Sequence, residues 1–519
     1  MNAEPLQNPL LTTTKDSQIL VLLFRLVIAF SIIGCAIGSV VVAANQQEIL
    51  VGFIGTFILI IASIPLYIRR DYSLFEPATF VILLVLFGTP LKLLYVISSH
   101  TEDRHVAQIL MNFENPDFLI PALAIVAVSW VFFIVGYLVK IPKSPLGNLF
   151  MPRRDAWSGR YLQIILVALM AVSIACFVAF ILTAGVSFSS LSGLSQKRFS
   201  DEAGTAASRI HSTKYFLYRG AAISKFLVYF GLVWLLSRNK RFMSWTGALV
   251  LFALFQTMFL SFVISNRAGI VLILIDCLVI FFYMRNTLSV RSLLIAFGVV
   301  CALLIPMLAV RGKEDLTLSK FAQKTLAGRD LLDITKTCHI IRGVPKRMDF
   351  VNGETLFGWM AAPIPSSMWE GKPMWAGKGP YINQHIFKDK AGISGVPPGL
   401  IAEFYWNFGY FGVFAGMFVL GLFLRHLFET FRQFIGNPSS VLIYTLIVTR
   451  FGIFALGSDL GTGIIKTALD LVPVMVILLF VGYSSSIEES GSEHLETMPA
   501  NVPLPAGQRD RKPPAKIAY

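Results

Sequence analysis

Long apolar runs separated by polar segments fill the chain from residue 18 to residue 484. Twelve of them have about the 18 residues that an α-helix needs to cross the hydrocarbon core of a membrane. They cover residues 18–43, 49–68, 75–97, 118–140, 161–184, 220–237, 244–264, 268–284, 292–310, 399–424, 439–457 and 466–483. The pattern predicts an all-α polytopic membrane protein with about twelve transmembrane helices.

Composition excludes an ordinary soluble protein. Hydrophobic residues make up 55% of the 519 positions and charged residues 14%, whereas soluble domains carry about 25% charged residues. We expect residues 18–484 to form one transmembrane domain. Residues 1–17 are a polar N-terminal segment, and residues 485–519 form a polar, Pro-rich tail that is expected to be disordered. No small-residue cleavage site follows the first run at the right distance, so we expect its helix to be retained.

Lys and Arg predict the orientation of the helices. They collect in alternate short connections, at 69–70, 140–160, 237–242, 285–291 and 425–432. The short segments 44–48 and 458–465 contain neither residue. Because short cytoplasmic loops carry an excess of Lys and Arg, both chain ends are predicted to be cytoplasmic.

Two long segments, 185–219 and 311–398, are then predicted to lie outside. The second holds thirteen basic residues against eight acidic ones and is too long for a simple connection, so we expect short helices in it. A charged loop is often merely solvated. Arginine, however, has a planar fork that suits phosphate, and these arginines predict an anionic ligand such as a lipid pyrophosphate. They are Arg209, Arg219, Arg311, Arg342 and Arg347.

Several ionisable residues lie within the apolar runs or at their ends. They are Arg25, Lys92, Lys225, Asp276, Glu403, Arg450 and Lys466. Such residues are expensive in lipid and commonly functional, although long side chains near a helix end can snorkel to the surface. We favour snorkelling for Arg25, Lys92 and Lys466. Arg450 lies too deep for it, and Arg267 stands between two runs at the predicted outer side.

Two neighbouring stretches carry a resemblance to a known family. APIPSSMWEGKPMW at 362–375 is followed by PPGLIAEFYWNFGYFG at 397–412, and SNRAG stands at 265–269. With twelve spans and two long outer loops, the chain resembles the Wzy-type O-antigen polymerases, which join oligosaccharide repeat units at bacterial inner membranes. Members typically show a proline-rich Trp-Lys-Pro element before a segment like GE-Y-NFG-G. Ser366 departs from the family, because members often carry a basic residue there.

The resemblance implies a reaction, a fold and partners. A growing glycan on undecaprenyl pyrophosphate is transferred to the terminal hydroxyl of a lipid-linked repeat unit, and undecaprenyl pyrophosphate leaves. It also implies a GT-C-like fold, an active site on the periplasmic side of the inner membrane, and a chain-length regulator as partner. Pyrophosphate is a good leaving group, so neither a metal nor another cofactor is expected if cations stabilise its charge. No clustered Cys and His spacing predicts a metal site.

Candidate residues follow from this chemistry. A carboxylate that accepts the proton of the attacking hydroxyl acts as a general base, and Glu403 is the candidate. The alternative role for Glu403 is to satisfy free N–H groups at a helix start. The expected cationic clamp is Arg267, Arg311, Arg342, Arg347 and Arg450, with Arg209 and Arg219 closing over it.

Aromatic rings with a polar group suit the apolar faces of sugars. Trp369, Trp375, Trp406 and Tyr405 are the candidates. Tyr and Trp also collect at membrane interfaces, and that explanation is strongest for Trp406.

Two other functions remain open. An O-antigen ligase resembles this architecture and also uses lipid-pyrophosphate donors, but the Trp-Lys-Pro and NFG elements favour a polymerase. A flippase or transporter of lipid-linked oligosaccharides would use the arginines along a transport path. Such transporters usually contain internal repeats, and no repeat is evident in this sequence.

Overall fold

The structure is a computed structural model of the full chain. It describes residues 15–98, 119–139, 157, 159–183, 213–238, 243–263, 266–285, 288–295, 298–299, 333–361, 364, 368–369, 378–386 and 396–496. All regular secondary structure in these residues is helical, as the apolar pattern predicts.

Before the second long loop the structure describes, with their bounds, the helices α1 (Lys15–Val42), α2 (Gln46–Ile68), α3 (Pro77–Gly88), α4 (Pro90–Ser98), α6 (Leu119–Leu138), α8 (Gly159–Thr183), α11 (Thr213–Ala221), α12 (Ser224–Ser237), α13 (Trp245–Val263) and α14 (Arg267–Arg285). Within the described part of that loop lie four short ones: α17 (Ile334–Gly343), α18 (Glu354–Phe357), the 3₁₀-helix η4 (Gly358–Ala361) and α19 (Lys378–His385). The last four are α20 (Leu400–Arg432), α21 (Pro438–Thr449), the π-helix η5 (Arg450–Ala455) and α22 (Leu460–Glu496).

Eleven helical segments among the described residues are long and apolar enough to cross a membrane. Each corresponds to a predicted run, and α3 with α4 forms one of them. Most of the remaining run, 292–310, lies outside the described residues. The expected short helices in the second long loop are confirmed by α17, α18 and α19. The last helix continues to Glu496, into the segment expected to be the tail.

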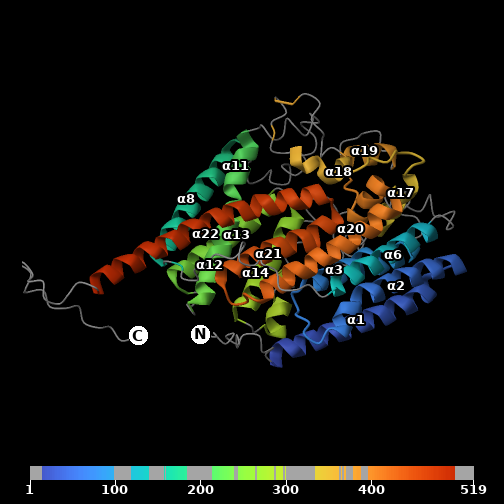
Figure 1. Ribbon diagram of the computed structural model, residues 1–519, viewed down its shortest axis with the longest axis horizontal. Coiled ribbons are helices and arrows are strands. Elements are labelled where there is room, and N and C mark those ends of the chain that lie inside the picture. The colour runs from blue at the N-terminus through green and yellow to red at the C-terminus, as the bar shows by residue number, and fades with distance from the viewer. Residues whose placement is uncertain are drawn as a thin grey trace, which may run out of the picture.

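The buried apolar side chains form two large clusters that share α20. One joins α1, α2, α3, α4, α6 and α17 with the first two thirds of α20. The other joins α8, α12, α13, α14, α21 and α22 with the end of α20, where Phe428 and Phe431 are buried. Figure 1 shows α20 beside α21 and α22 in the bundle, with α6, α2 and α1 beyond it. α20 therefore connects the two halves.

α6 and α20 approach each other unusually closely. A Cβ atom added at Gly136 would lie 2.2 Å from the carbonyl oxygen of Phe418, and one added at Gly421 would lie 2.1 Å from that of Phe133. Small residues allow membrane helices to bring their backbones into contact. These two glycines fix the position of α20 against α6.

α20 is interrupted within its NFG sequence. Phe408 and Gly409 leave the helical conformation, and Gly409 has φ +60° and ψ −143°, a region open almost only to glycine. Just before the break, the Asn407 side chain donates to the hydroxyl of Thr355 at 2.6 Å and accepts from the N–H of Gly353 at 2.8 Å. Asn407 thus attaches the second long loop to the first part of α20.

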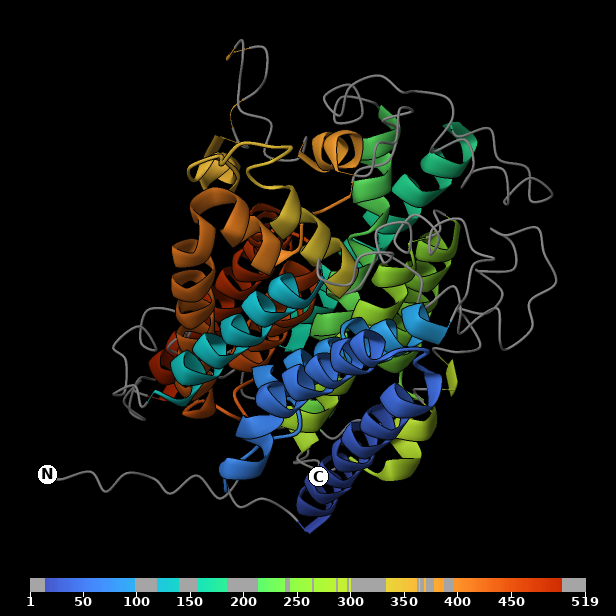
Figure 2. The same cartoon turned by 90° about the vertical axis from the view of Figure 1, so that its right-hand side faces the viewer.

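The short helices of the second loop share one side of the bundle. α18 and α19 lie at the upper side in Figures 1 and 2, whereas α1 starts at the lower side. This separation agrees with a topology that has the start of α1 on one side of a membrane and the helices α18 and α19 on the other.

Candidate functional site at the start of α20

Glu403 lies in the first turn of α20 and is 1% exposed. Its Oε2 accepts a hydrogen bond of 2.7 Å from the backbone N–H of Leu460, the first residue of α22. The carboxylate therefore faces the N-terminus of another helix, where the helix dipole favours negative charge. The helix-start role considered for Glu403 is present, but at α22 rather than at its own helix.

A buried lysine contacts the turn that precedes α22, Gly457–Leu460. Lys336, in the first turn of α17, is 1% exposed, and its ammonium group donates to the carbonyl oxygen of Gly457 at 3.3 Å. The N–H of Gly399, just before α20, donates to the carbonyl oxygen of Ser458 at 2.6 Å. The turn Gly457–Leu460 thus holds together the starts of α17, α20 and α22.

Asp333 fixes the start of α17. Its carboxylate accepts from the N–H of Thr335 at 3.1 Å, which is a helix N-cap. Lys92 of α4 pairs with it at 3.6 Å. Burial favours a raised pKa for Asp333, but the charges of Lys92 and Lys336 outweigh burial and hold the pKa below its ordinary value. Lys92 and Lys336 thus lie beside one buried carboxylate, Asp333, and the three described groups together carry a net positive charge.

Asp459 occupies the N-cap position of α22. Its Oδ1 accepts from the N–H of Thr462 at 2.6 Å, and its Oδ2 accepts from the Thr462 hydroxyl at 2.8 Å. Glu403 and Asp459 therefore share the N-terminus of α22, while Lys336 approaches from α17. A carboxylate from α20 and an ammonium from α17 therefore contact one turn, an arrangement that could supply a proton acceptor and a positive charge.

The predicted arginines separate into several groups. Arg342, in the last turn of α17, and Arg347, just after it, are both exposed. Arg219 is exposed in the last turn of α11. Arg267 begins α14, but its side chain is outside the described set. Arg209 and Arg311 lie outside the described residues.

The predicted sugar-binding aromatics differ in exposure. Trp369 is 41% exposed, whereas Trp406 is fully buried. The indole N–H of Trp406 donates to the carbonyl oxygen of Asp349 at 2.9 Å, and its ring stacks on Tyr381. Tyr405 is also buried, and Trp375 lies outside the described residues. Trp406 and Tyr405 are therefore part of the packed interior around the site. Of the described candidates, Trp369 alone has an exposed side chain.

Arg450 belongs to a different cluster, embedded among the apolar helices. Its guanidinium pairs with Asp470 of α22 at 2.8 Å and with Asp276 of α14 at 3.1 Å. The Tyr229 hydroxyl donates to Asp276 at 2.6 Å, and Lys225 pairs with Asp470. Two cations and two carboxylates balance there. Arg450 also begins a π-helix, a feature often found at functional sites.

The structure therefore does not bring all predicted catalytic residues together. The described polar contacts of Arg450 join α12, α14 and α22, whereas those of Glu403 join α20 to the start of α22. With its donors directed at carboxylates, Arg450 is not presented to an anionic ligand.

No protein-family model, curated protein or solved structure matches this chain. Among the described residues, no group of three or more His, Cys, Asp or Glu side chains is placed to hold a metal ion.

Three residues were missed or misread in the sequence. Asp470 lies inside an apolar run, so the signal that identified Asp276 was also present there. Lys92 was expected to snorkel but is 2% exposed and pairs with Asp333. This interpretation was wrong because α17 packs against α4 and brings Asp333, the residue before α17, to the Lys92 ammonium group. Lys336 had no local signal, since it lies in a polar loop among other lysines.

Proposed function

We propose that this protein polymerises undecaprenyl-pyrophosphate-linked oligosaccharide repeat units on the periplasmic side of a bacterial inner membrane. The observation that carries the proposal is that Glu403 and Lys336 both bond to the backbone of one turn, Gly457–Leu460. A buried carboxylate and a buried ammonium thus contact the same turn near the start of α20, about one helical turn before the NFG segment.

In the proposed reaction the terminal hydroxyl oxygen of the acceptor unit attacks the anomeric carbon of the donor glycan. The bond between that carbon and the pyrophosphate oxygen breaks, and undecaprenyl pyrophosphate leaves with the bonding electrons. Glu403 accepts the hydroxyl proton as general base. Cationic side chains stabilise the charge that develops on the leaving oxygen.

The described residues divide these tasks by exposure. Arg342 and Arg347 are exposed near the end of α17, and they are assigned to the first capture of the pyrophosphate. Lys336, at the buried start of the same helix, is assigned to the leaving group. α18 lies against the start of α20, because the Thr355 hydroxyl accepts a hydrogen bond from Asn407 in the second turn of α20. For the acceptor to reach Glu403, α18 has to move aside. Trp369 is assigned to the sugar.

The test is reconstitution of the purified full-length protein in liposomes with lipid-linked repeat units and a chelator, without nucleotide sugars. A ladder of lengthening glycans is expected. Arg342→Ala should abolish the ladder, and Arg291→Ala, an exposed arginine on the predicted opposite side, should leave it unchanged. Intact repeat units after prolonged incubation would reject the proposal. Transfer only to an added lipid A core would indicate a ligase instead.

A transporter of lipid-linked oligosaccharides is the second candidate. The cluster of Lys225, Asp276, Arg450 and Asp470 favours it, because ionisable groups inside membrane helices often mark transport paths. In the same liposomes a transporter would move repeat units across the bilayer without lengthening them. An assay with an impermeant reagent that cleaves exposed glycans separates the two functions.

A further inference from the structure

A cavity of about 320 Å³ lies at the end of the bundle opposite to Glu403. Its walls come from the first half of α1, from residues 70–74, from the last turn of α14 and from the end of α20. Glu403 lies in the first turn of α20, whereas the cavity reaches Arg432 at its last residue. The distribution of Lys and Arg predicts that this end is cytoplasmic.

Three arginines line the cavity: Arg25, Arg70 and Arg432. The Arg25 guanidinium is held in place, because it donates to the backbone oxygens of Leu66 at 2.9 Å and Arg69 at 3.1 Å. A guanidinium has five N–H donors, so Arg25 keeps others for a ligand. Arg70 is exposed, and no ion pair joins it to the other described residues.

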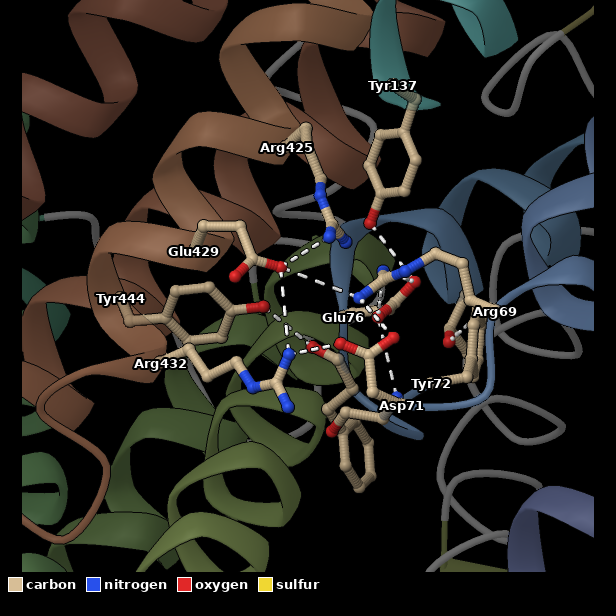
Figure 3. A network of polar contacts seen from close by, with 12 residues as sticks. Arg69, Asp71, Tyr72, Glu76, Tyr137, Arg425, Glu429, Arg432 and Tyr444 are labelled. Atoms are coloured by element: carbon tan, nitrogen blue, oxygen red, sulfur yellow. Dashed lines mark hydrogen bonds and ion pairs between the residues drawn. The ribbon is translucent and has the colours of Figure 1, made fainter. Parts of the chain in front are cut away.

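The acidic side chain in the wall is already neutralised. Asp71 pairs with Arg432 and with Arg69, the latter at 3.3 Å. Arg69 in turn binds the buried carboxylate of Glu76 at 2.7 Å. Figure 3 shows this chain of contacts, with Arg432 between Asp71 and Glu429.

Positive charge therefore exceeds negative charge around the cavity. Among the described residues, three arginines line it against one carboxylate: Arg25, Arg70 and Arg432 against Asp71. The planar guanidinium group of arginine binds phosphate through two parallel hydrogen bonds. The excess suits a ligand of one or two negative charges.

The rest of the wall is apolar. Val21 and Leu22 of α1 face Phe282 and Phe428 from the bundle. Leu22 is 56% exposed, so the cavity reaches the side of α1 that would face lipid. A site with cationic and apolar walls at the end of a membrane helix suits an amphiphile.

We propose that this cavity binds the phosphate of an anionic lipid, with the headgroup at Arg25 and Arg70, beside the ion pair of Arg432 with Asp71, and an acyl chain along Val21 and Leu22. The bound lipid would contact α1 on one wall of the cavity and the ends of α14 and α20 on the other, and so connect them. Basic pockets between membrane helices on the cytoplasmic side commonly bind anionic headgroups.

The experiment uses the purified full-length protein in a neutral detergent and measures its thermal unfolding midpoint during ligand titration. The probes are short-chain phosphatidylglycerol, short-chain phosphatidylcholine and inorganic phosphate. Phosphatidylglycerol should raise the midpoint to a plateau, because a ligand that binds the folded state stabilises it. Phosphatidylcholine, which has no net charge, should have no saturable effect.

Arg70→Gln should weaken the phosphatidylglycerol affinity by about tenfold or more, the loss expected for one charge-assisted hydrogen bond. Arg70→Glu should weaken it further. Both changes are at an exposed position and leave the Asp71 contacts in place. The control is Arg291→Gln, on the same predicted side but outside the cavity, which should bind like the unaltered protein.

Equal responses to the two lipids, or an affinity that ignores both Arg70 variants, would overturn the proposal. If inorganic phosphate alone gave the full effect with the same dependence on Arg70, the phosphate site would stand and the lipid would be rejected as its source. None of these outcomes depends on polymerisation, because binding is measured at the opposite end from Glu403.

Discussion

The carboxylate of Glu403 caps the N-terminus of a helix that begins 57 residues later, through the 2.7 Å hydrogen bond from the N–H of Leu460. The two residues lie at the predicted outer ends of two different spans. This contact gives Glu403 a structural role and a possible chemical role at once. A substitution that separates hydrogen bonding from basicity can distinguish them.

Glu403→Gln is expected to keep the fold and to lose most of the activity. The amide oxygen of Gln still accepts from the N–H of Leu460, but it cannot take a proton from an acceptor hydroxyl. Loss of a general base lowers a rate by about 10²–10⁴-fold. The measurement is the initial rate of ladder formation together with the thermal unfolding midpoint.

Glu403→Ala provides the comparison. It removes the acceptor of the Leu460 N–H and should destabilise the protein by about 1–3 kcal/mol. If Glu403→Gln polymerised at the normal rate, Glu403 would be a helix cap and another group would have to be the base.

Arg450→Met is expected to destabilise the protein severely. It leaves Asp276 and Asp470 buried with Lys225 as the remaining cation of the cluster, and breaking a buried ion pair costs about 3–5 kcal/mol. Thermal unfolding in detergent is the measurement. The double change Arg450→Met with Asp276→Asn restores charge balance and should recover part of the loss. A fully stable but inactive Arg450→Met protein would instead return Arg450 to the active site.

Gly421→Val is expected to disrupt the packing of α20 on α6. The new side chain would meet the carbonyl oxygen of Phe133, where even a Cβ atom would lie 2.1 Å away. Overpacking costs about 1–3 kcal/mol and occasionally more. The control is Gly34→Val in α1, where no atom lies within 4 Å of an added Cβ. Equal unfolding midpoints for the two variants would show that the close helix contact does not form.

Glu76 is expected to make stability depend on pH. Burial raises the pKa of its carboxyl to about 7, although the Arg69 guanidinium acts in the opposite direction. Between the ordinary pKa of a Glu carboxyl and about pH 7, the folded state holds a proton that the unfolded state has released. The resulting stability is present below the ordinary pKa and is lost as the pH rises through about 7.

The measurement is the unfolding midpoint between pH 5 and 8 for the unaltered protein and for Glu76→Gln, a substitution that stays neutral at every pH. The Gln variant should lose the decline with rising pH. Asp71→Asn is the control. Partial burial favours a raised pKa for Asp71, but Arg69 and Arg432 outweigh burial and hold the pKa low, so this change should leave the decline in place. A decline of the same size in Glu76→Gln would assign it to other groups.

Hydrophobicity along the chain was enough to predict the class of the fold. Eleven of the predicted runs correspond to helices that can span a membrane, because crossing lipid requires a continuous apolar segment with every backbone hydrogen bond satisfied internally. That requirement acts within each segment and leaves a local signal. The short helices in the second outer loop were predictable for a similar reason, since the loop is too long to remain a simple connection.

The site was only partly predictable. Glu403 was identified because a carboxylate inside an apolar run is unusual at any position, and the same rule applied to Asp470 would have found the partner of Arg450. No rule of this kind locates Lys336, because a lysine in a polar loop has the same sequence signal whether it is solvated or buried.

The sequence by itself therefore determined the membrane-spanning helices and the presence of charges among them. The tertiary structure decided the partners of those charges: Leu460 for Glu403, Asp276 and Asp470 for Arg450, and Gly457 for Lys336. The cost of placing a residue in lipid is set by that residue and its neighbours in the chain. Its partners are set by how helices far apart in the sequence pack together, as α20 does on α6 through Gly136 and Gly421.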